Sequence, residues 1–300
     1  MKIACLQYAP EVGQLHTNMA KANVLIDDAI GAGRTAGLDW LLLPELALTG
    51  YNFASLEAIA PFLEPTAAGA STKWAVDVAT RLRCHVTVGY PEQAADGHRY
   101  NATVTVSPAG EVLANYRKTF LYYTDETWAH EGDRQFFSGN LGALGPVSMV
   151  IYISTCQPQT NMSLTITQGI CMDINPHKFL APWEAYEFAR AAQAAESPIV
   201  VLNMAWLTRL TPDELMLQRA DSDNETLAYW LERFYPLIND SGADRPPVVL
   251  VIANRCGVEA GAVYAGTSTI MKIERGEVRI YDILGRAEES LLVVDLDQVS

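Results

Sequence analysis

The chain has 300 residues, 49% of them hydrophobic, and a formal net charge of −14. This length suits one large α/β domain, predicted over residues 1–300, better than two small ones. The acidic balance argues against nucleic acid and anionic membranes as partners, because both attract clustered Lys and Arg. The chain opens directly in a strand pattern, and no run approaches about 18 apolar residues. We therefore expect a cytoplasmic protein with neither signal peptide nor membrane span.

Strand-like runs alternate with segments of helical period along the first half of the chain. Glycine and proline separate many of them, and Pro108–Gly110 predicts a hairpin turn. The expected strands are Ile3–Tyr8, Trp40–Leu43, Cys84–Tyr90, Thr103–Val106 and Val112–Tyr116, and the expected helices are Asn18–Ile30 and Trp74–Leu82.

The second half continues the alternation, which predicts a layered α/β fold. Two polar stretches interrupt it, Gly139–Asn161 around a strand-like Val147–Ser154, and the acidic Thr211–Asn224. Each is either an inert surface loop or a lid. The expected strands are Leu164–Ile170, Ile199–Asn203, Val248–Asn254, Ser268–Ile273, Val278–Tyr281 and Leu291–Asp295, and the expected helices are Trp183–Ala195 and a segment around Leu227–Leu237.

One cysteine lies where an expected strand ends. Cys171 follows Ile170 and precedes a turn with Asp173 and Pro176. Tight backbone with free N–H groups is the setting that a nucleophilic thiol and its oxyanion need. A free cysteine is more often a small buried hydrophobe, so this interpretation depends on other residues. The five cysteines show no CxxC spacing, which fits a reducing compartment.

Two further segments carry a charged residue directly after an apolar strand. Glu45 closes the run Leu41–Pro44, where a carboxylate is either a strand-end group that reaches solvent or a desolvated acid–base. Lys118 follows the strand Val112–Tyr116, and it is either a solvated cation beside Arg117 or a charge that supports an oxyanion. The sequence leaves both alternatives open at this point.

Glu45, Lys118 and Cys171, in this order and each at a strand end, resemble the Glu–Lys–Cys triad of the nitrilase (carbon–nitrogen hydrolase) superfamily. The resemblance implies a four-layer α-β-β-α sandwich with Glu45 as base, Lys118 beside the oxyanion and Cys171 as nucleophile, without cofactor or metal. It covers nearly the whole chain and includes Lys2–Tyr8, Tyr100-Asn101, Asn254–Gly257 and Tyr264–Ser268.

The resemblance also implies a second acid beside the lysine. Glu126 is predicted for this role, with Glu131 as the alternative; Glu126 could equally be an exposed loop acid. The five histidines show no metal-binding spacing and offer no partner for Cys171, and no GxSxG motif occurs. A metal site, a Cys–His pair and a serine hydrolase are therefore disfavoured.

The strings Gly169–Phe179 and Tyr116–Glu126 resemble a fungal branch of the superfamily that converts an N-terminal Asn or Gln of proteins to Asp or Glu within an N-degron pathway. The implied partners are protein or peptide N-termini. Such a substrate presents an ammonium beside a short amide, so we expect an acid in the pocket. The predicted substrate-binding residues are the acids Asp125 and Glu64, the wall residues Tyr51, Asn203 and Trp206, and the backbone N–H of Met172.

Three alternatives remain beside this hypothesis. An ω-amidase would need a cation for a substrate carboxylate, but Asn175 stands where many family members carry an arginine. A catalytically silent scaffold is disfavoured by the intact triad. A redox-sensing protein is disfavoured because no resolving cysteine lies close in sequence. The sequence decides neither between Asn and Gln nor between a monomer and a homodimer.

Overall fold

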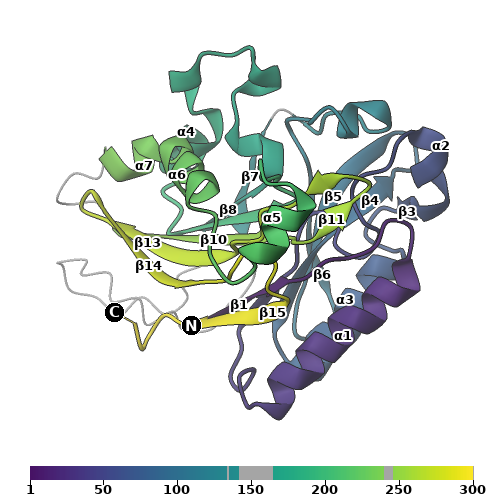
Figure 1. The fold of residues 1–300 in the computed structure, drawn as a ribbon, viewed down its shortest axis with the longest axis horizontal. Coiled ribbons are helices and arrows are strands. Elements are labelled where there is room, and N and C mark those ends of the chain that lie inside the picture. The colour runs from purple at the N-terminus through teal and green to yellow at the C-terminus, as the bar shows by residue number, and fades with distance from the viewer. Residues whose placement is uncertain (134, 142–164, 240–245, 300) are drawn as a thin grey trace.

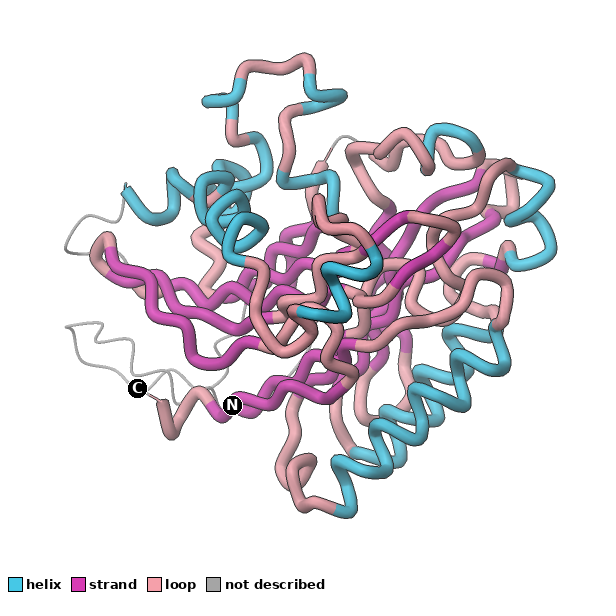
Figure 2. The backbone as a smooth tube through the Cα atoms, viewed as in Figure 1, coloured by secondary structure: helices cyan, strands magenta, loops and turns pink. Residues whose placement is uncertain are grey.

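The computed structural model describes residues 1–133, 135–141, 165–239 and 246–299. The predicted polar stretch Gly139–Asn161 lies outside the described residues from position 142 onward, and so does its strand-like segment Val147–Ser154. Figure 2 shows the strands in the middle of the molecule and the helices on two outer sides.

The first sheet contains the N-terminal strand and the strand that closes the chain. Its order is β15-β1-β2-β4-β5-β6, with β3 paired to β4 outside this path. The strands β1, β2 and β4 run parallel, while β4–β5–β6 and β1–β15 are antiparallel. The strands are β1 (Lys2–Gln7), β2 (Trp40–Leu42), β3 (Glu64–Pro65), β4 (His85–Gln93), β5 (Arg99–Val106), β6 (Val112–Arg117) and β15 (Ser290–Asp295).

The second sheet has the order β14-β13-β10-β9-β8-β7, with β8, β9 and β10 parallel. A short ribbon of β11 (Val258–Glu259) and β12 (Ala262–Val263) follows β10. The strands of the sheet are β7 (Phe137–Asn140), β8 (Thr165–Ile170), β9 (Ile199–Met204), β10 (Val248–Asn254), β13 (Thr269–Glu274) and β14 (Glu277–Ile283).

Helices cover the outer face of each sheet (Figure 1). The first sheet packs on α1 (Leu15–Gly31) and α3 (Ala70–Leu82), and the second on α4 (Glu187–Ala194), α6 (Asn224–Arg233) and α7 (Tyr235–Asn239). The other helices described are α2 (Leu56–Ile59) and α5 (Pro212–Leu217). The 3₁₀ turns are η1 (Ala60–Phe62), η2 (Asp125–Thr127), η3 (Cys171–Ile174), η4 (His177–Phe179) and η5 (Trp183–Ala185).

The alternation of side chains along β1 explains the layers. Ala4 and Leu6 pack with α1 and α3, while Ile3 and Cys5 pack between the two sheets. Successive residues of a strand face opposite sides, so a strand with both faces apolar is covered on both sides. The structure therefore confirms the four-layer α-β-β-α prediction.

Three predicted segments differ from the structure. The helix expected over Trp183–Ala195 is interrupted at Tyr186, whose φ is 46°, a conformation that a continuous right-handed helix excludes. The segment around Leu227–Leu237 is divided into α6 and α7. The polar Thr211–Asn224 contains α5, which begins with a capping box between Thr211 and Glu214.

Candidate active site

Glu45 lies in a turn directly after β2, and its carboxylate is fully buried. Leu46 beside it has a φ of 42°. The turn packs against β4 at Gly89, where an added Cβ would come within 2.6 Å of the Leu46 nitrogen and 2.9 Å of the Glu45 Cα. Glycine at position 89 thus allows the close backbone approach that holds Glu45 at this edge of the sheet.

Lys118 follows β6 and is fully buried between two carboxylates. Its Nζ donates to Glu45 Oε1 at 2.5 Å and to Asp125 Oδ2 at 2.6 Å. Asp125 opens the turn η2, and it also accepts a hydrogen bond from the Tyr122 backbone N–H at 3.0 Å. A buried cation paired with two acids is held in one position, because each alternative leaves a charge without a partner.

Two groups that the sequence analysis did not assign to the site complete the contacts of Glu45. Asn101 Nδ2 donates to Glu45 Oε1 at 2.6 Å and to Asp125 Oδ1 at 3.0 Å. The backbone N–H of Ala205, just after β9, donates to Glu45 Oε2 at 2.9 Å. Asn101 had two sequence signals: the pair Tyr100-Asn101 is part of the family resemblance, and the amide precedes the alternating Ala102–Val106 run of β5. The Ala205 contact had none, since any residue supplies a backbone N–H.

Cys171 begins the turn η3 directly after β8 and has a φ of 40°. This left-handed conformation is uncommon for a non-glycine residue and costs about 1–3 kcal/mol, so the surrounding structure must hold it. Cys171 is 7% exposed. Upstream, an added Cβ on Gly169 would come within 2.6 Å of the Phe188 ring, so glycine there lets α4 pack against the end of β8.

The buried carboxylate of Asp173 fixes the cysteine turn. Asp173 accepts from the Ile170 N–H and the Tyr116 hydroxyl, both at 2.7 Å. It also accepts from the N–H groups of Thr119 at 3.0 Å and Phe120 at 2.7 Å. These two residues follow Lys118, so one carboxylate joins the Cys171 turn of the second sheet to the Lys118 segment of the first.

The pKa shifts follow from this burial and from the charges nearby. Burial raises the pKa of Glu45, although Lys118 and Asn101 act in the opposite direction. Burial and the charge of Glu45 raise the pKa of the Cys171 thiol, which Lys118 and the Ala205 N–H lower in part. Burial disfavours the charge of Lys118, but Asp125 and Glu45 outweigh it and raise its pKa. These shifts favour the protonated thiol of Cys171 and the ammonium of Lys118.

The second acid is not the residue that the sequence predicted. Glu126 is exposed, whereas Asp125 contacts Lys118. Neighbouring residues in the tight turn η2 point in different directions, so only one of the two faces inward. The alternative, Glu131, pairs with His177 at 2.6 Å. The prediction for Glu126 is therefore corrected in favour of Asp125.

The acids expected to bind the substrate ammonium have other partners. Asp125 contacts Lys118 and Asn101, as described above. Glu64 is buried in β3, and it accepts hydrogen bonds from the Ser71 N–H at 2.9 Å and the Ser71 hydroxyl at 2.7 Å, in the first turn of α3. The prediction that Asp125 or Glu64 binds the substrate ammonium is corrected, because the carboxylate oxygens of both residues already accept hydrogen bonds within the protein.

The three predicted wall residues lie in different settings. Asn203 is fully buried; its Nδ2 donates to the Leu43 carbonyl at 2.6 Å, and its Oδ1 accepts from Gln168 at 3.0 Å. Asn203 thus joins the two sheets, and the prediction that it contacts the substrate is corrected. The Tyr51 ring centroid lies 5.7 Å from Lys118 Nζ. Trp206 follows Ala205, is partly exposed and packs 5.3 Å from the Tyr229 ring.

The backbone of Met172 follows Cys171 within η3, and its side chain is buried. Its sulfur lies 3.2 Å from Asn175 Nδ2, and Asn175 Oδ1 accepts from the Tyr229 hydroxyl at 2.6 Å. Asn175 is thus a buried neutral group. Beyond Cys171, the structure therefore presents the amide of Asn175, the thioether of Met172 and the aromatic rings of Tyr229 and Trp206.

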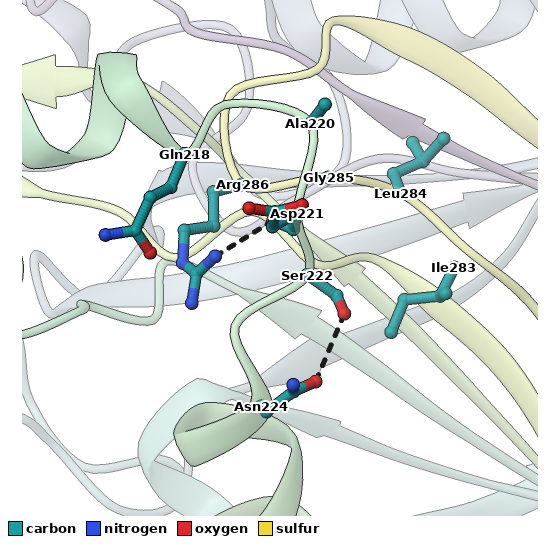
Figure 3. A pocket seen from close by; sticks show the side chains of 9 residues that line it. All are labelled: Gln218, Ala220, Asp221, Ser222, Asn224, Ile283, Leu284, Gly285 and Arg286. Carbon is teal, nitrogen blue, oxygen red and sulfur yellow. Dashed lines mark hydrogen bonds between the residues drawn. The ribbon is translucent and has the colours of Figure 1, made fainter.

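A separate cavity of 470 Å³ lies between the segment after α5 and the end of β14 (Figure 3). It shares no residue with the cluster around Cys171. Arg286 donates to the Asp221 carbonyl at 3.2 Å, and Ser222 donates to Asn224 at 3.2 Å. The residues that line this cavity include no cysteine, histidine or lysine.

The described residues contain no group of three or more His, Cys, Asp or Glu side chains placed to hold a metal ion. In the same part of the chain, no helix is long and apolar enough to cross a membrane. Cys5, Cys84, Cys171 and Cys256 are free and buried.

Comparison with known proteins adds sequence relationships to this geometry. The model of the carbon-nitrogen hydrolase family matches residues 2–199. The chain is 34% identical to the protein N-terminal amidase of Schizosaccharomyces pombe, over 99% of this chain and all of the relative. It is 30% identical to the protein N-terminal amidase of Saccharomyces cerevisiae, over 69% of this chain and 45% of the relative.

Solved structures give the same picture at the level of the fold. A crystal structure of N-terminal amidase with an Asn-Glu-Ala peptide superposes with a TM-score of 0.86 at 21% identity, over 98% of this chain and 97% of that one. A crystal structure of N-terminal amidase with a Gln-Gly peptide has a TM-score of 0.85 at 21% identity, over 98% and 96% of the two chains.

Proposed function

Because the chain belongs to the carbon-nitrogen hydrolase family, we propose that it deamidates N-terminal Asn and Gln residues of proteins or peptides, releasing ammonia. The observation that carries the proposal is the buried Cys171 thiol, whose pKa is affected by the charges of Glu45 and Lys118. Asp125 holds Lys118 in place, and Asn101 holds Glu45. The S. pombe relative named protein N-terminal amidase, similar over its full length, supports the choice of substrate.

The first half of the proposed reaction forms a thioester. Glu45 removes the thiol proton as Cys171 attacks the side-chain amide carbon, so no free thiolate needs to exist beforehand. Lys118 and the backbone N–H of Met172 stabilise the oxyanion of the tetrahedral intermediate. Glu45 then returns the proton to the leaving nitrogen, the C–N bond breaks, and ammonia departs.

The second half regenerates the enzyme. Glu45 removes a proton from a water molecule, whose oxygen attacks the thioester carbon. The C–S bond breaks, the thiol takes back its proton, and the new side chain is a carboxylic acid. Asp125 and Asn101 hold Lys118 and Glu45 in place throughout. The raised pKa of Glu45, caused by burial, suits a group that alternates between base and acid.

The neutral surroundings of Asn175 support a peptide substrate over a free 2-oxo acid amide. An ω-amidase requires a cation beside the substrate carboxylate, and position 175 offers an amide bonded to the Tyr229 hydroxyl. The half-exposed rings of Trp206 and Tyr229 instead offer faces that attract an ammonium by the cation–π interaction. We assign the substrate ammonium to this aromatic wall, in place of the acids Asp125 and Glu64.

Peptides with free and acetylated N-termini test the function. Acetylation removes the ammonium and any cation–π or charge-assisted contact, and we expect ammonia release to slow by at least about a hundredfold. Trp206→Leu should raise KM for the free peptide and leave the residual rate on the acetylated peptide unchanged. Equal rates on free and acetylated peptides would mean a general amidase, and no release from either would remove the proposed function.

A further inference from the structure

We propose that Glu259 is a positioning residue for the active site, whose carboxylate, paired with Arg255, fixes Tyr51 against Lys118 and Cys171. Glu259 lies in β11 and Arg255 directly after β10, so neither belongs to the segments that carry Glu45, Lys118 or Cys171. The inference rests on the proposed function for its kinetic readout, and a second readout is independent of any substrate.

The carboxylate of Glu259 is buried and receives donors from three segments. Its Oε2 accepts from the N–H groups of Tyr51 at 3.1 Å and Asn52 at 2.9 Å, and from the Tyr264 hydroxyl at 2.8 Å. Its Oε1 is bonded to Arg255 Nη2. The Asn52 side chain also donates to the Glu259 carbonyl at 3.0 Å. The Tyr51–Asn52 segment is therefore attached to this glutamate by backbone and side chain together.

Tyr51 connects this network to the catalytic groups. Its ring packs edge-on against Tyr264, with centroids 6.5 Å apart, and lies 5.7 Å from Lys118 Nζ. Burial raises the pKa of its hydroxyl, and the charges of Asp125, Glu45 and Cys171 add to that rise. Tyr51 and Cys171 are both buried, and the Tyr51 ring lies beside Lys118, whose charge also acts on the Cys171 thiol.

The segment that carries Tyr51 lies in close contact with both the N-terminal segment and Glu259. Gly50 before Tyr51 has a φ of 83°, and a Cβ there would come within 2.6 Å of the Val12 Cα and 3.1 Å of Glu259 Oε1. The backbone is thus pressed between the N-terminal segment and the glutamate. If the carboxylate is lost, the N–H groups of Tyr51 and Asn52 lose their buried acceptor, and the segment must shift toward water or another partner.

A glutamine cannot replace the carboxylate here. The amide has one acceptor oxygen and two N–H groups, while Glu259 has a donor pointing at each of its oxygens. Arg255 would also lose its anionic partner; its Nε and Nη1 have no hydrogen-bond partner within the described part of the chain. Glu259→Gln therefore changes the shape little, but it removes one of the two acceptor oxygens and the counter-ion of Arg255.

The first experiment measures kcat/KM for a Gln-leading peptide in Glu259→Gln, which we expect to fall at least about tenfold. Glu92→Gln is the matched control, because Glu92 is also buried and paired with an arginine, Arg117, at 2.5 Å. The other partners of Glu92 are Thr66 and Asn115, so this variant should stay within about threefold of wild type. Equal losses in both variants would overturn the proposal.

The second experiment separates positioning through Tyr51 from a general loss of structure. In a double-mutant cycle, Glu259→Gln should cost less than about twofold once Tyr51 is already alanine. Independent effects that multiply in the double variant would contradict action through Tyr51. If Glu259→Gln does not fold, Tyr264→Phe removes one donor to the carboxylate and keeps the ring, and the same cycle with Tyr51→Ala decides the question.

The third experiment needs no substrate. Iodoacetamide alkylation of Cys171, followed by mass spectrometry, should become at least about fivefold faster in Glu259→Gln, because a displaced Tyr51 uncovers the thiol. Glu92→Gln should react at the wild-type rate. An unchanged rate in Glu259→Gln overturns the positioning role. If wild-type enzyme releases no ammonia from the peptide, the proposed function fails, yet the alkylation comparison still tests the positioning of Tyr51.

Discussion

The two sheets contribute different kinds of chemistry to one site. The first sheet supplies charged groups, Glu45 after β2 and Lys118 after β6, which hold each other through short hydrogen bonds. The second supplies the thiol of Cys171 after β8, held in a left-handed conformation by the turn that Asp173 fixes. Charges can be positioned by one another, whereas a thiol must be positioned by its backbone.

Both sheets contribute apolar side chains to the core that lies between them. This core contains Ile3 and Trp40 from the first sheet and Ile199 and Val251 from the second, together with a few buried polar contacts such as Gln168 to Thr103. Polar contacts cross between the sheets near the strand ends, where Asn203 donates to the Leu43 carbonyl and Asp173 accepts from Thr119. The apolar interior makes the sheets pack, and the polar crossings set their relative position at the site.

The largest expected effect comes from the second sheet. Cys171→Ala removes the nucleophile and little volume, so ammonia release should fall by at least about 10³-fold. Thermal unfolding should stay close to wild type. Cys84→Ala is the control, a buried free cysteine behind the first sheet, and it should retain turnover. A Cys171→Ala variant with a tenth of wild-type turnover would exclude the covalent mechanism.

On the first sheet, Lys118→Met should lower kcat on the order of 10²–10³-fold, about 3 kcal/mol, with a smaller effect on KM. The ammonium is needed as the oxyanion develops, and its loss leaves Glu45 and Asp125 without their shared cation. Lys73→Met, an exposed lysine on α3, is the control. A normal kcat with only a raised KM would make Lys118 a binding residue.

The pH dependence of kcat/KM tests the role of Glu45 on the first sheet. Burial raises the pKa of Glu45 above its ordinary 4.5, and Glu45 must be ionised to accept the thiol proton. Below that raised pKa, kcat/KM should fall about tenfold per pH unit. Asn101→Ala removes a hydrogen bond that stabilises the carboxylate and should move this limb to higher pH. Asn115→Ala, whose amide contacts Glu92, should not; a limb unmoved by Asn101→Ala would exclude Glu45 as its source.

Much of the fold could be predicted because the strands are long, apolar and separated by clear turns. The expected Val248–Asn254 coincides with β10, and Pro108–Gly110 does join β5 and β6. Glu45, Lys118 and Cys171 each follow a strand, but this pattern left their roles open, and the resemblance to the nitrilase superfamily selected them. The strand pattern therefore indicates candidate positions, and the family motif selects among them.

The remaining contacts depend on distant parts of the chain. Asn203 lies near the end of β9, yet its amide points across to the first sheet. Glu259 is far from the triad in sequence, and only the ribbon after β10 brings it to Tyr51. The break at Tyr186 depends on a single left-handed residue that no periodicity reveals. Sequence patterns indicate the strand ends but not the direction of each side chain beyond them.

The smallest effect is expected for Glu126, which tests the same limit at one pair of adjacent acids. Glu126→Gln changes an exposed carboxylate, so kcat/KM should stay within about twofold of wild type. Asp125→Asn is its matched contrast: the amide nitrogen cannot accept from both Lys118 and the Tyr122 N–H, which share Asp125 Oδ2. That variant should lose at least about tenfold in kcat, because Lys118 loses one of its two anionic partners. Steady-state rates of both variants on one Gln-leading peptide decide between them. The reverse order, with Glu126→Gln the slower enzyme, would mean that the turn η2 presents the other acid to the lysine during catalysis.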